Sequence, residues 1–314
     1  MEKINLGNTE LKVSQMGLGC LYFGARDSIE KSFRRMDQYT SAGGNFLDTA
    51  NMYSHWISDQ TSGGESEKTI GKWLKKKKNR EEMIIATKVG FPYDGVAYGT
   101  SKEQIKDECH KSLKRLNTDY IDLYYAHTDD RNTPLEETLQ AFNELIQEGK
   151  VRYIGASNFR AWRLERARQI SKINDWQQYC CIQQRYSYLR PRPGADFGEQ
   201  VAVNKDLLDF VDDTGISLIA YSPLLQGAYT DPNKEFSEQY RCPDARARLE
   251  ALDKVAENIK ATRNQLVYYW LMNSEPRAIP LVAASTDQQF AEALGALDIN
   301  LSGKQMELLN QAQH

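Results

Sequence analysis

Short apolar runs alternate with longer amphipathic segments along the whole chain, and this alternation restricts the possible folds more than any other feature. A segment with helical periodicity follows each apolar run, as in Ser101–Leu116 and Pro134–Glu148. Parallel strands need crossover connections of this kind, so the pattern predicts a parallel sheet of class α/β. The eight predicted strands are Gln15–Cys20, Asn45–Asp48, Met83–Lys88, Ile121–Ala126, Val151–Ala156, Cys181–Arg185, Ile216–Tyr221 and Ala278–Val282.

Eight strand–helix units in 314 residues match a closed (β/α)₈ TIM barrel, which is the predicted fold. A β-hairpin is predicted ahead of the first unit, with strands near residues 3–6 and 11–14, and an extra helix is predicted at the C-terminus. Ser101 and Thr133 are the predicted N-caps of two helices, the second with Pro134 at the first helical position. No Gly/Ser-rich linker divides the chain, so residues 1–314 are predicted to form a single domain.

A doubly wound sheet is the rival fold, and it usually carries a G-x-G-x-x-G turn after its first strand. The nearest match is Gly17-Leu18-Gly19-Cys20-Leu21-Tyr22-Phe23-Gly24, in which the third glycine comes two places late. Two glycines alone are weak support for a nucleotide-binding turn, so the barrel is favoured.

The composition excludes several classes of partner. A net charge of −3 offers no basic surface for nucleic acid. The five cysteines have no metal-ligand spacing and suit the reduced state of a cytoplasmic protein. Residues 1–5 lack an apolar signal region and no apolar run approaches eighteen residues, so neither export nor a membrane span is expected. The four histidines, His55, His110, His127 and His314, are too scattered to predict a metal site.

Titratable side chains end three successive predicted strands. In (β/α)₈ barrels the reactive groups come from these C-terminal ends, whereas the strand interiors fill the core. Each group alone has a structural explanation, such as a helix cap for Asp48 or a satisfied core position for His127. Asp48 ends the second strand, Tyr53 follows it, Lys88 ends the third strand, and His127 follows the fourth. Because all four side chains are expected at the same rim of the barrel, together they predict a catalytic site.

These four groups suit the protonation of a carbonyl. A phenol with a pKa near 10 is a poor proton donor at neutral pH unless its anion is stabilised. An ammonium about 4 Å away supplies roughly 4 kcal/mol at an effective dielectric near 20, or about three pKa units. We therefore expect Lys88 alone to bring the pKa of Tyr53 close to neutrality, with Asp48 keeping Lys88 charged. Neutral His127 would orient the carbonyl, and a nicotinamide or flavin would supply the hydride.

The segments FLDTANMYS, IATKVG and YYAHTDD, which carry these four residues, resemble the catalytic tetrad of the aldo-keto reductases. The resemblance extends from MGLGCLYFG at the first strand to ALDINLS near the end of the chain. It implies a (β/α)₈-barrel reductase of carbonyl compounds that prefers NADPH. It also implies that Tyr53 is the general acid, that Lys88 and Asp48 lower its pKa, and that His127 orients the substrate.

The resemblance further implies a cofactor site. In GASNF, Ser157 and Asn158 would hold the nicotinamide carboxamide, although they could instead only cap the next helix. In CIQQRYS, Gln183 would share that carboxamide, with Gln184 as the competing register. The remaining implied contacts are Tyr221 under the nicotinamide ring, Ser222, Leu224, Gln226 and Gly227 along the pyrophosphate, Cys20 and Leu21 at the first-strand turn, and Ser285, Thr286 and Gln289 at the adenosine end.

The adenosine end departs from the family pattern. A 2′-phosphate is best held by Arg or Lys. Neither occurs in residues 283–293, where Gln289 stands at the usual arginine position and Ala293 at the usual asparagine. NADPH remains the expected cofactor with NADH as the alternative, and Ser285 and Thr286 are neutral donors for a phosphate.

A second departure is the long segment after Tyr53, which is expected to form a wall of the substrate pocket. His55 and Trp56 lie in it, and Phe91 follows the third strand. These three residues are the predicted substrate contacts, although Trp56 could simply be packed. The polar loops suggest a sugar-like carbonyl substrate.

The leading hypothesis is therefore an NADPH-dependent reductase of small-molecule aldehydes or ketones. The alternative is a redox-sensing or regulatory subunit that binds nucleotide with the same fold, although the chain has no amphipathic terminal extension for docking. A third class, the metal-dependent barrel lyases and isomerases, would need clustered ligands that the scattered histidines do not provide.

Overall fold

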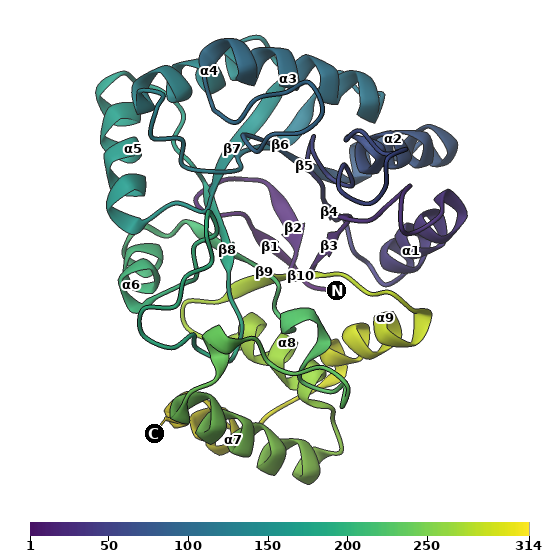
Figure 1. The fold of residues 1–314 in the computed structure, drawn as a ribbon, viewed down its shortest axis with the longest axis vertical. Helices are drawn as coiled ribbons and strands as arrows, with labels where there is room; N and C mark the ends of the chain where they lie inside the picture. The colour runs from purple at the N-terminus through teal and green to yellow at the C-terminus, as the bar shows by residue number, and fades with distance from the viewer. Residues whose placement is uncertain (314) are drawn as a thin grey trace.

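A computed structural model describes residues 1–313 and shows eight parallel strands closed into a barrel, in the order β10-β3-β4-β5-β6-β7-β8-β9 (Figure 1). The predicted TIM barrel is therefore confirmed. His314, the last residue of the printed sequence, lies outside the described residues. The barrel strands are β3 Gly17–Gly19, β4 Phe46–Asp48, β5 Ile84–Val89, β6 Ile121–Ala126, β7 Val151–Ser157, β8 Cys181–Arg185, β9 Ser217–Tyr221 and β10 Ala278–Val282.

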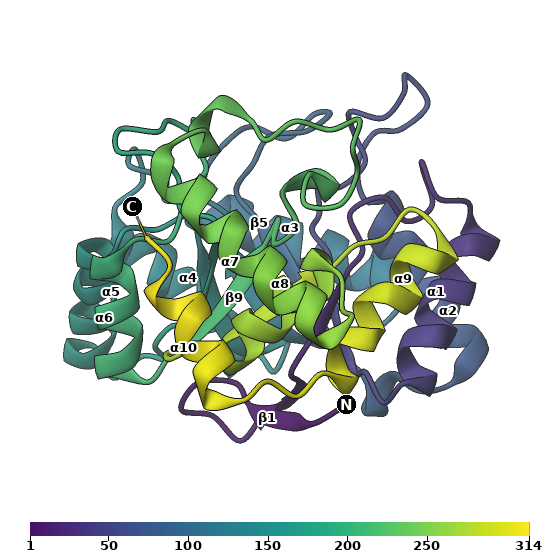
Figure 2. The ribbon, with the colours of Figure 1, turned by 90° about the horizontal axis from the view of Figure 1, so that it is seen from below.

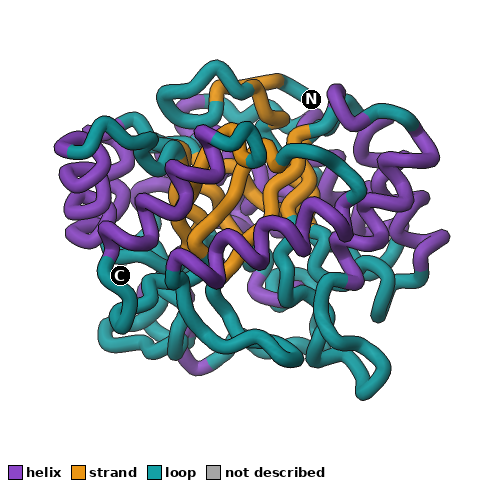
Figure 3. The backbone as a smooth tube through the Cα atoms, turned by 90° about the horizontal axis from the view of Figure 1, so that it is seen from above, coloured by secondary structure: helices purple, strands orange, loops and turns teal. Residues whose placement is uncertain are grey.

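Helices surround the strands, as the tube in Figure 3 shows. Several begin at side-chain caps: Ser101, as predicted, accepts a hydrogen bond from the Gln104 backbone N–H. The helices are α1 Ile29–Ser41, α2 Glu65–Lys77, α3 Lys102–Leu116, α4 Leu135–Gln147, α5 Ala161–Ile173, α6 Lys205–Thr214, α7 Pro243–Ile259, α8 Arg263–Asn273, α9 Asp287–Leu294 and α10 Gly303–Gln311, with short 3₁₀ turns at Arg80–Glu82, Leu225–Gly227, Glu238–Tyr240 and Gly295–Asp298.

The predicted cap at Thr133 is wrong. Helix α4 begins one residue later than expected, with Pro134 at the N-cap. The Thr133 hydroxyl instead donates a hydrogen bond to Asp130 Oδ2 at 2.6 Å. Pro134 has an extended ψ of 129°, so the helix starts only at Leu135 and Thr133 lies one residue too early to cap it.

The predicted N-terminal hairpin, β1 Lys3–Asn5 with β2 Lys12–Ser14, covers one end of the barrel. Figure 2 shows it at the opposite end from the long loops. Leu6, Leu11 and Val13 of this hairpin are buried in one cluster with the inward-facing strand residues. Because the hairpin closes the N-terminal end, the C-terminal ends of the strands are the ones left facing the loops.

Successive strand residues alternate between the barrel interior and the surrounding helices. On β5, Ile84 and Ala86 pack inside the barrel, whereas Ile85 packs against the helix layer. Lys88 continues the inward series at the end of β5, and it therefore points into the mouth of the barrel. This alternation decides which strand-terminal side chains can meet there.

We expect Gly71→Ala to destabilise the fold, because a Cβ at Gly71 would lie 2.4 Å from the Arg115 carbonyl oxygen and 2.7 Å from the Leu116 carbonyl carbon. These are backbone atoms, so helices α2 and α3 would have to separate. The free energy of unfolding should fall by about 1–3 kcal/mol in urea denaturation. Gly303→Ala is the matched control, since nothing lies within 4 Å of its added methyl group; equal losses in both variants would contradict the packing argument.

Candidate active site

An amine, a carboxylate and a phenol meet at the mouth of the barrel. Lys88 Nζ donates hydrogen bonds to Asp48 Oδ1 at 2.5 Å, to the Thr49 carbonyl oxygen at 2.7 Å and to the Tyr53 hydroxyl at 3.0 Å. The side chains of Lys88 and Asp48 are 0% and 1% exposed. Strands β4 and β5 pair in register, which brings the two strand ends side by side. All three donor positions of the ammonium are therefore used.

The charges of this group are held by one another. Burial disfavours the charged form of Lys88 and is the largest single influence on it, but the Asp48 carboxylate and the Tyr53 hydroxyl together outweigh burial and raise the pKa of the amine. Burial also raises the pKa of Asp48, and the Lys88 ammonium offsets part of that increase. Gln183 adds a further hydrogen bond from Nε2 to Asp48 Oδ2 at 2.7 Å. Lys88 and Asp48 thus form a buried ion pair, and the Gln183 amide donates to the carboxylate oxygen that Lys88 does not contact.

The expected direction of the Tyr53 shift is wrong. The pKa of Tyr53 is raised, because burial disfavours the phenolate more than the Lys88 ammonium stabilises it, and the Asp48 carboxylate opposes it as well. The ammonium alone would lower the pKa of Tyr53, as expected, but the desolvation of the phenol has the larger effect and raises it. Tyr53 is thus a protonated phenol at neutral pH, hydrogen-bonded to a cation that stabilises its anion once a proton leaves.

His127 lies beside the phenol and is neutral. The centroid of its ring is 5.9 Å from that of Tyr53 and 4.6 Å from that of Phe91. Burial and the nearby Lys88 charge lower the pKa of His127 well below its usual value. Its backbone carbonyl accepts a hydrogen bond from Asn158 Nδ2 at 2.9 Å. Among the described residues, none is hydrogen-bonded to the buried His127 Nδ1 atom.

A buried polar network behind β4 and β5 was missed by sequence reasoning. Glu108 on α3 is 1% exposed, and it accepts hydrogen bonds from Asn51 Nδ2 at 2.7 Å and from the Tyr93 hydroxyl at 2.5 Å. Asn51 comes two residues before Tyr53, and Tyr93 comes two residues after Phe91. One helix carboxylate therefore fixes both loops that carry site residues. The only signal in the sequence was a glutamate on the apolar face of a predicted helix.

The GASNF segment holds the barrel mouth together. Asn158, with φ of 62°, donates to the His127 carbonyl and accepts from the Tyr221 hydroxyl at 2.8 Å and from the Val201 backbone at 3.2 Å. The alternative that Ser157 and Asn158 cap the next helix is wrong, because α5 begins at Ala161 with Arg160 at the N-cap. The side chain of Asn158 instead links the ends of β6, β7 and β9.

The two glutamines of CIQQRYS point in opposite directions. Gln183 lies within the mouth and contacts Asp48. Gln184 faces the outside of the barrel, where its Oε1 accepts from the Asn158 backbone N–H at 2.6 Å and its Nε2 donates to the Phe159 carbonyl at 2.8 Å. Strand alternation separates them, and the register that brings a glutamine beside the ion pair is that of Gln183.

The remaining predicted cofactor contacts lie on three loops at the same end. After β9, Ser222, Leu225, Gln226 and Gly227 all have positive φ, with values of 53°, 47°, 62° and 92°, so this loop turns sharply after Leu224. Cys20 is fully buried, and the carbonyl of Leu21 accepts from the Ser54 hydroxyl at 3.0 Å. At the start of α9, Gln289 Oε1 accepts from the backbone N–H groups of Ser285 and Thr286 at 2.9 and 3.2 Å.

The predicted substrate residues form an aromatic edge beside Tyr53. The ring of Trp56 lies 6.4 Å from that of Tyr53 and 5.2 Å from that of His55 by centroids, in edge-on contacts. Trp56 is 45% exposed, so nearly half of its side chain is accessible to solvent. Phe91 lies on the other side, against His127. The side chains that flank the phenol are therefore largely apolar.

Comparison with known proteins agrees with this geometry. The model of the aldo/keto reductase family matches residues 15–314. The chain belongs to the aldo/keto reductase family. The solved structure of the thermostable aldo-keto reductase Tm1743 in complex with the inhibitor epalrestat superposes with a TM-score of 0.78 at 29% identity, covering 99% of this chain and 100% of that one.

Curated relatives of this aldo/keto reductase are oxidoreductases. It is 30% identical to the uncharacterized oxidoreductase YrpG of Bacillus subtilis over 99% of this chain and 95% of that protein. It is 28% identical to the versiconal hemiacetal acetate reductase of Aspergillus parasiticus, covering 99% and 96%. An aryl-alcohol dehydrogenase of Phanerodontia chrysosporium, whose name specifies NADP(+), is 29% identical over 96% and 82%. The chain is thus an oxidoreductase of the aldo/keto reductase type.

Neither a metal-ligand cluster nor a candidate membrane-spanning helix occurs within residues 1–313. No cluster of three or more His, Cys, Asp or Glu residues there could hold a metal ion. No helix in the same range is both long enough and apolar enough to cross a membrane.

The lowered pKa of His127 predicts a pH dependence of stability. Below the unfolded-state pKa near 6.5 the unfolded chain binds a proton that the folded chain does not, so the free energy of unfolding falls as the pH decreases. One pH unit below that value the loss from this residue should be about 1.4 kcal/mol. Urea denaturation of the wild type and His127→Gln between pH 7.5 and 5.5 measures it; an identical pH dependence in both would contradict a neutral buried imidazole.

Proposed function

We propose that this chain reduces an aldehyde or ketone to the alcohol with NADPH, and catalyses the reverse oxidation. The single observation that carries the proposal is the Lys88 ammonium, buried between the Asp48 carboxylate at 2.5 Å and the Tyr53 hydroxyl at 3.0 Å. Burying an ammonium is costly, and here the Asp48 carboxylate compensates its charge. A cation held against a phenol also stabilises the anion that forms when the phenol gives up its proton.

Tyr53 is proposed as the proton donor. The carbonyl carbon receives a hydride, which the reduced nicotinamide supplies when bound, and the carbonyl oxygen takes the phenolic proton. The phenolate left behind is stabilised by Lys88, whose own charge is held by Asp48. His127 is neutral and lies beside Tyr53, so an N–H of its ring can donate to the carbonyl oxygen and orient it. In the oxidation direction the same phenolate accepts the proton of the alcohol.

The cofactor is proposed to lie along the loop ends of β7 to β10. Ser157 and Gln183 have polar atoms at the mouth beside the ion pair, where they can bind the carboxamide, and the ring of Tyr221 can pack against the nicotinamide. The left-handed loop at residues 222–227 suits the pyrophosphate, because (β/α)₈ barrels commonly bind phosphate at the loops after their last two strands. Asn158, whose side chain is fully used by protein partners, is proposed to position Tyr221 and His127.

The substrate is proposed to be an aromatic or otherwise apolar aldehyde, in place of the sugar-like carbonyl that the loop composition suggested. The ring of Trp56 lies beside the phenol and that of Phe91 lies against His127, and planar aromatic substrates pack well against such rings. The name of the aryl-alcohol dehydrogenase among the relatives supports an aromatic substrate.

Tyr53→Phe should lower kcat by about 10²–10⁴-fold, since the general acid is removed while the ring volume stays. Cofactor affinity, measured by fluorescence titration, should change by less than about threefold, because the hydroxyl is assigned to the substrate. Tyr98→Phe is the control that removes another phenolic hydroxyl, one bonded at 2.9 Å to Thr128, and it should retain activity. A folded Tyr53→Phe enzyme with near-wild-type kcat would assign the acid elsewhere, and a wild type without turnover would favour a regulatory subunit.

Trp56→Ala should raise the KM for benzaldehyde-type substrates roughly tenfold, because an exposed ring that packs on the substrate is lost. The KM for a small polar aldehyde such as glyceraldehyde should stay within about twofold. Steady-state kinetics with both substrates test this. An equal rise for both would mean that Trp56 only supports its loop, and a rise for glyceraldehyde alone would restore the sugar-like assignment.

A further inference from the structure

We propose that Arg26, on the loop after β3, binds the adenosine 2′-phosphate of NADPH. This inference rests on the proposed function. Residues 283–293, at the loop after β10, contain no Arg or Lys, although a phosphate is best bound by such a side chain. The fold brings one from a distant part of the sequence, because Arg26 NH2 donates a hydrogen bond to Ser285 Oγ at 3.3 Å across 259 residues.

Arg26 is held in place by an aromatic ring. Its guanidinium carbon lies 3.4 Å from the centroid of the Tyr22 ring, and the side chain is exposed. This stacking fixes the plane of the guanidinium while leaving its edge, which carries the N–H donors, open to a ligand. Arg26 and Ser285 therefore place a cation and a hydroxyl next to each other. The oxygens of a phosphate monoester could accept hydrogen bonds from both groups.

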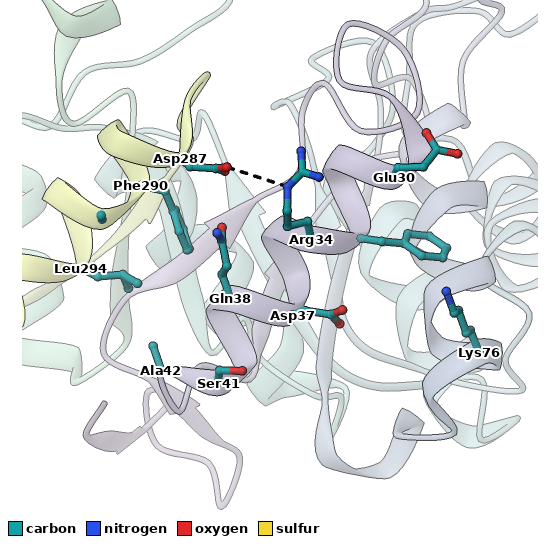
Figure 4. A pocket seen from close by; sticks show the side chains of 12 residues that line it. Glu30, Arg34, Asp37, Gln38, Ser41, Ala42, Lys76, Asp287, Phe290 and Leu294 are labelled. Atoms are coloured by element: carbon teal, nitrogen blue, oxygen red, sulfur yellow. Dashed lines mark ion pairs between the residues drawn. The ribbon is translucent and has the colours of Figure 1, made fainter.

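No carboxylate among the described residues forms an ion pair with Arg26, whereas Asp27 and Asp287, which lie close to Arg26 and Ser285 in the sequence, are each paired with another cation. Asp27 pairs with Lys31 at 2.5 Å. Asp287, the acidic residue that follows Ser285 most closely, lies 3.2 Å from Arg35 NH2 and 3.8 Å from Arg34 Nε. Figure 4 shows Asp287 directed at Arg34 across the groove between α1 and α9. The charge of Asp287 is thus compensated on the α1 side, and the charge of Arg26 is left for a ligand.

The residue at the usual arginine position has a different task. Gln289 forms a capping box with Thr286, in which its side-chain oxygen accepts the Ser285 and Thr286 backbone N–H groups. Gln289 therefore stabilises the start of α9 and leaves that oxygen no lone pair directed outward. In this chain, the cation for the 2′-phosphate comes from the first βα loop and the supporting hydroxyl from the last.

The experiment is a fluorescence titration of the wild type, Arg26→Met and Arg166→Met with NADPH and with NADH. Arg26→Met removes the charge and keeps much of the side-chain length. It should weaken NADPH binding about tenfold or more, as expected for a charge-assisted hydrogen bond, and change the Kd for NADH by less than about twofold. Arg166→Met, which removes an exposed arginine on α5, away from α1 and α9 (Figure 1), should change both Kd values by less than about threefold.

Displacement by small probes isolates the phosphate. Adenosine 2′,5′-bisphosphate and adenosine 5′-monophosphate differ only in the 2′-phosphate, so Arg26→Met should weaken the first about tenfold and leave the second unchanged. Equal weakening of NADPH and NADH would place Arg26 at the pyrophosphate, and an unchanged Kd for NADPH would leave it without a role; either result overturns the inference. A wild type that binds NADH better overturns it too, whereas a wild type that binds neither dinucleotide overturns the proposed function itself.

Discussion

The buried ion pair between Lys88 and Asp48 is the interaction on which the rest of the barrel mouth depends. Taking an ammonium and a carboxylate out of water costs several kcal/mol each, and only close contact with further hydrogen bonds compensates. Here the Thr49 carbonyl, the Tyr53 hydroxyl and the Gln183 amide supply those bonds. The phenol is therefore part of the solvation of the ammonium, which ties its position and its acidity to the same two strands.

Support for this pair comes from behind the strands as well as from within the mouth. Glu108 fixes the loops that carry Tyr53 and Phe91 through Asn51 and Tyr93. Glu67 on α2 accepts a hydrogen bond from Thr87, the residue before Lys88, at 2.6 Å. The buried carboxylates of Glu67 and Glu108 thus bind, from the helix layer, the segments that hold Lys88 and Tyr53 at the barrel mouth. Such outer partners restrict the geometry of a site as strongly as the groups that touch the substrate.

Much of the fold and of the site could be predicted because strand alternation is local information. The period of two determines that Lys88 and Gln183 face inward once their strands are recognised, and parallel strands necessarily end at one rim. The direction in which the pKa of Tyr53 shifts could not be predicted in the same way, since it depends on how completely the surrounding loops exclude water. The cap at Thr133 could not be predicted for a related reason: Pro134 is extended, with ψ of 129°, and that angle depends on the conformation of the loop before α4.

The sequence by itself determined the barrel, the end of the barrel that carries the site, and the identity of the four groups at its mouth. Each of these follows from periodicity and residue type along short segments. Only the tertiary structure decided the protonation of Tyr53 and His127, the separate tasks of Gln183 and Gln184, and the approach of Arg26 to Ser285. Those properties depend on desolvation and on contacts between residues far apart in the chain, and a linear pattern contains neither.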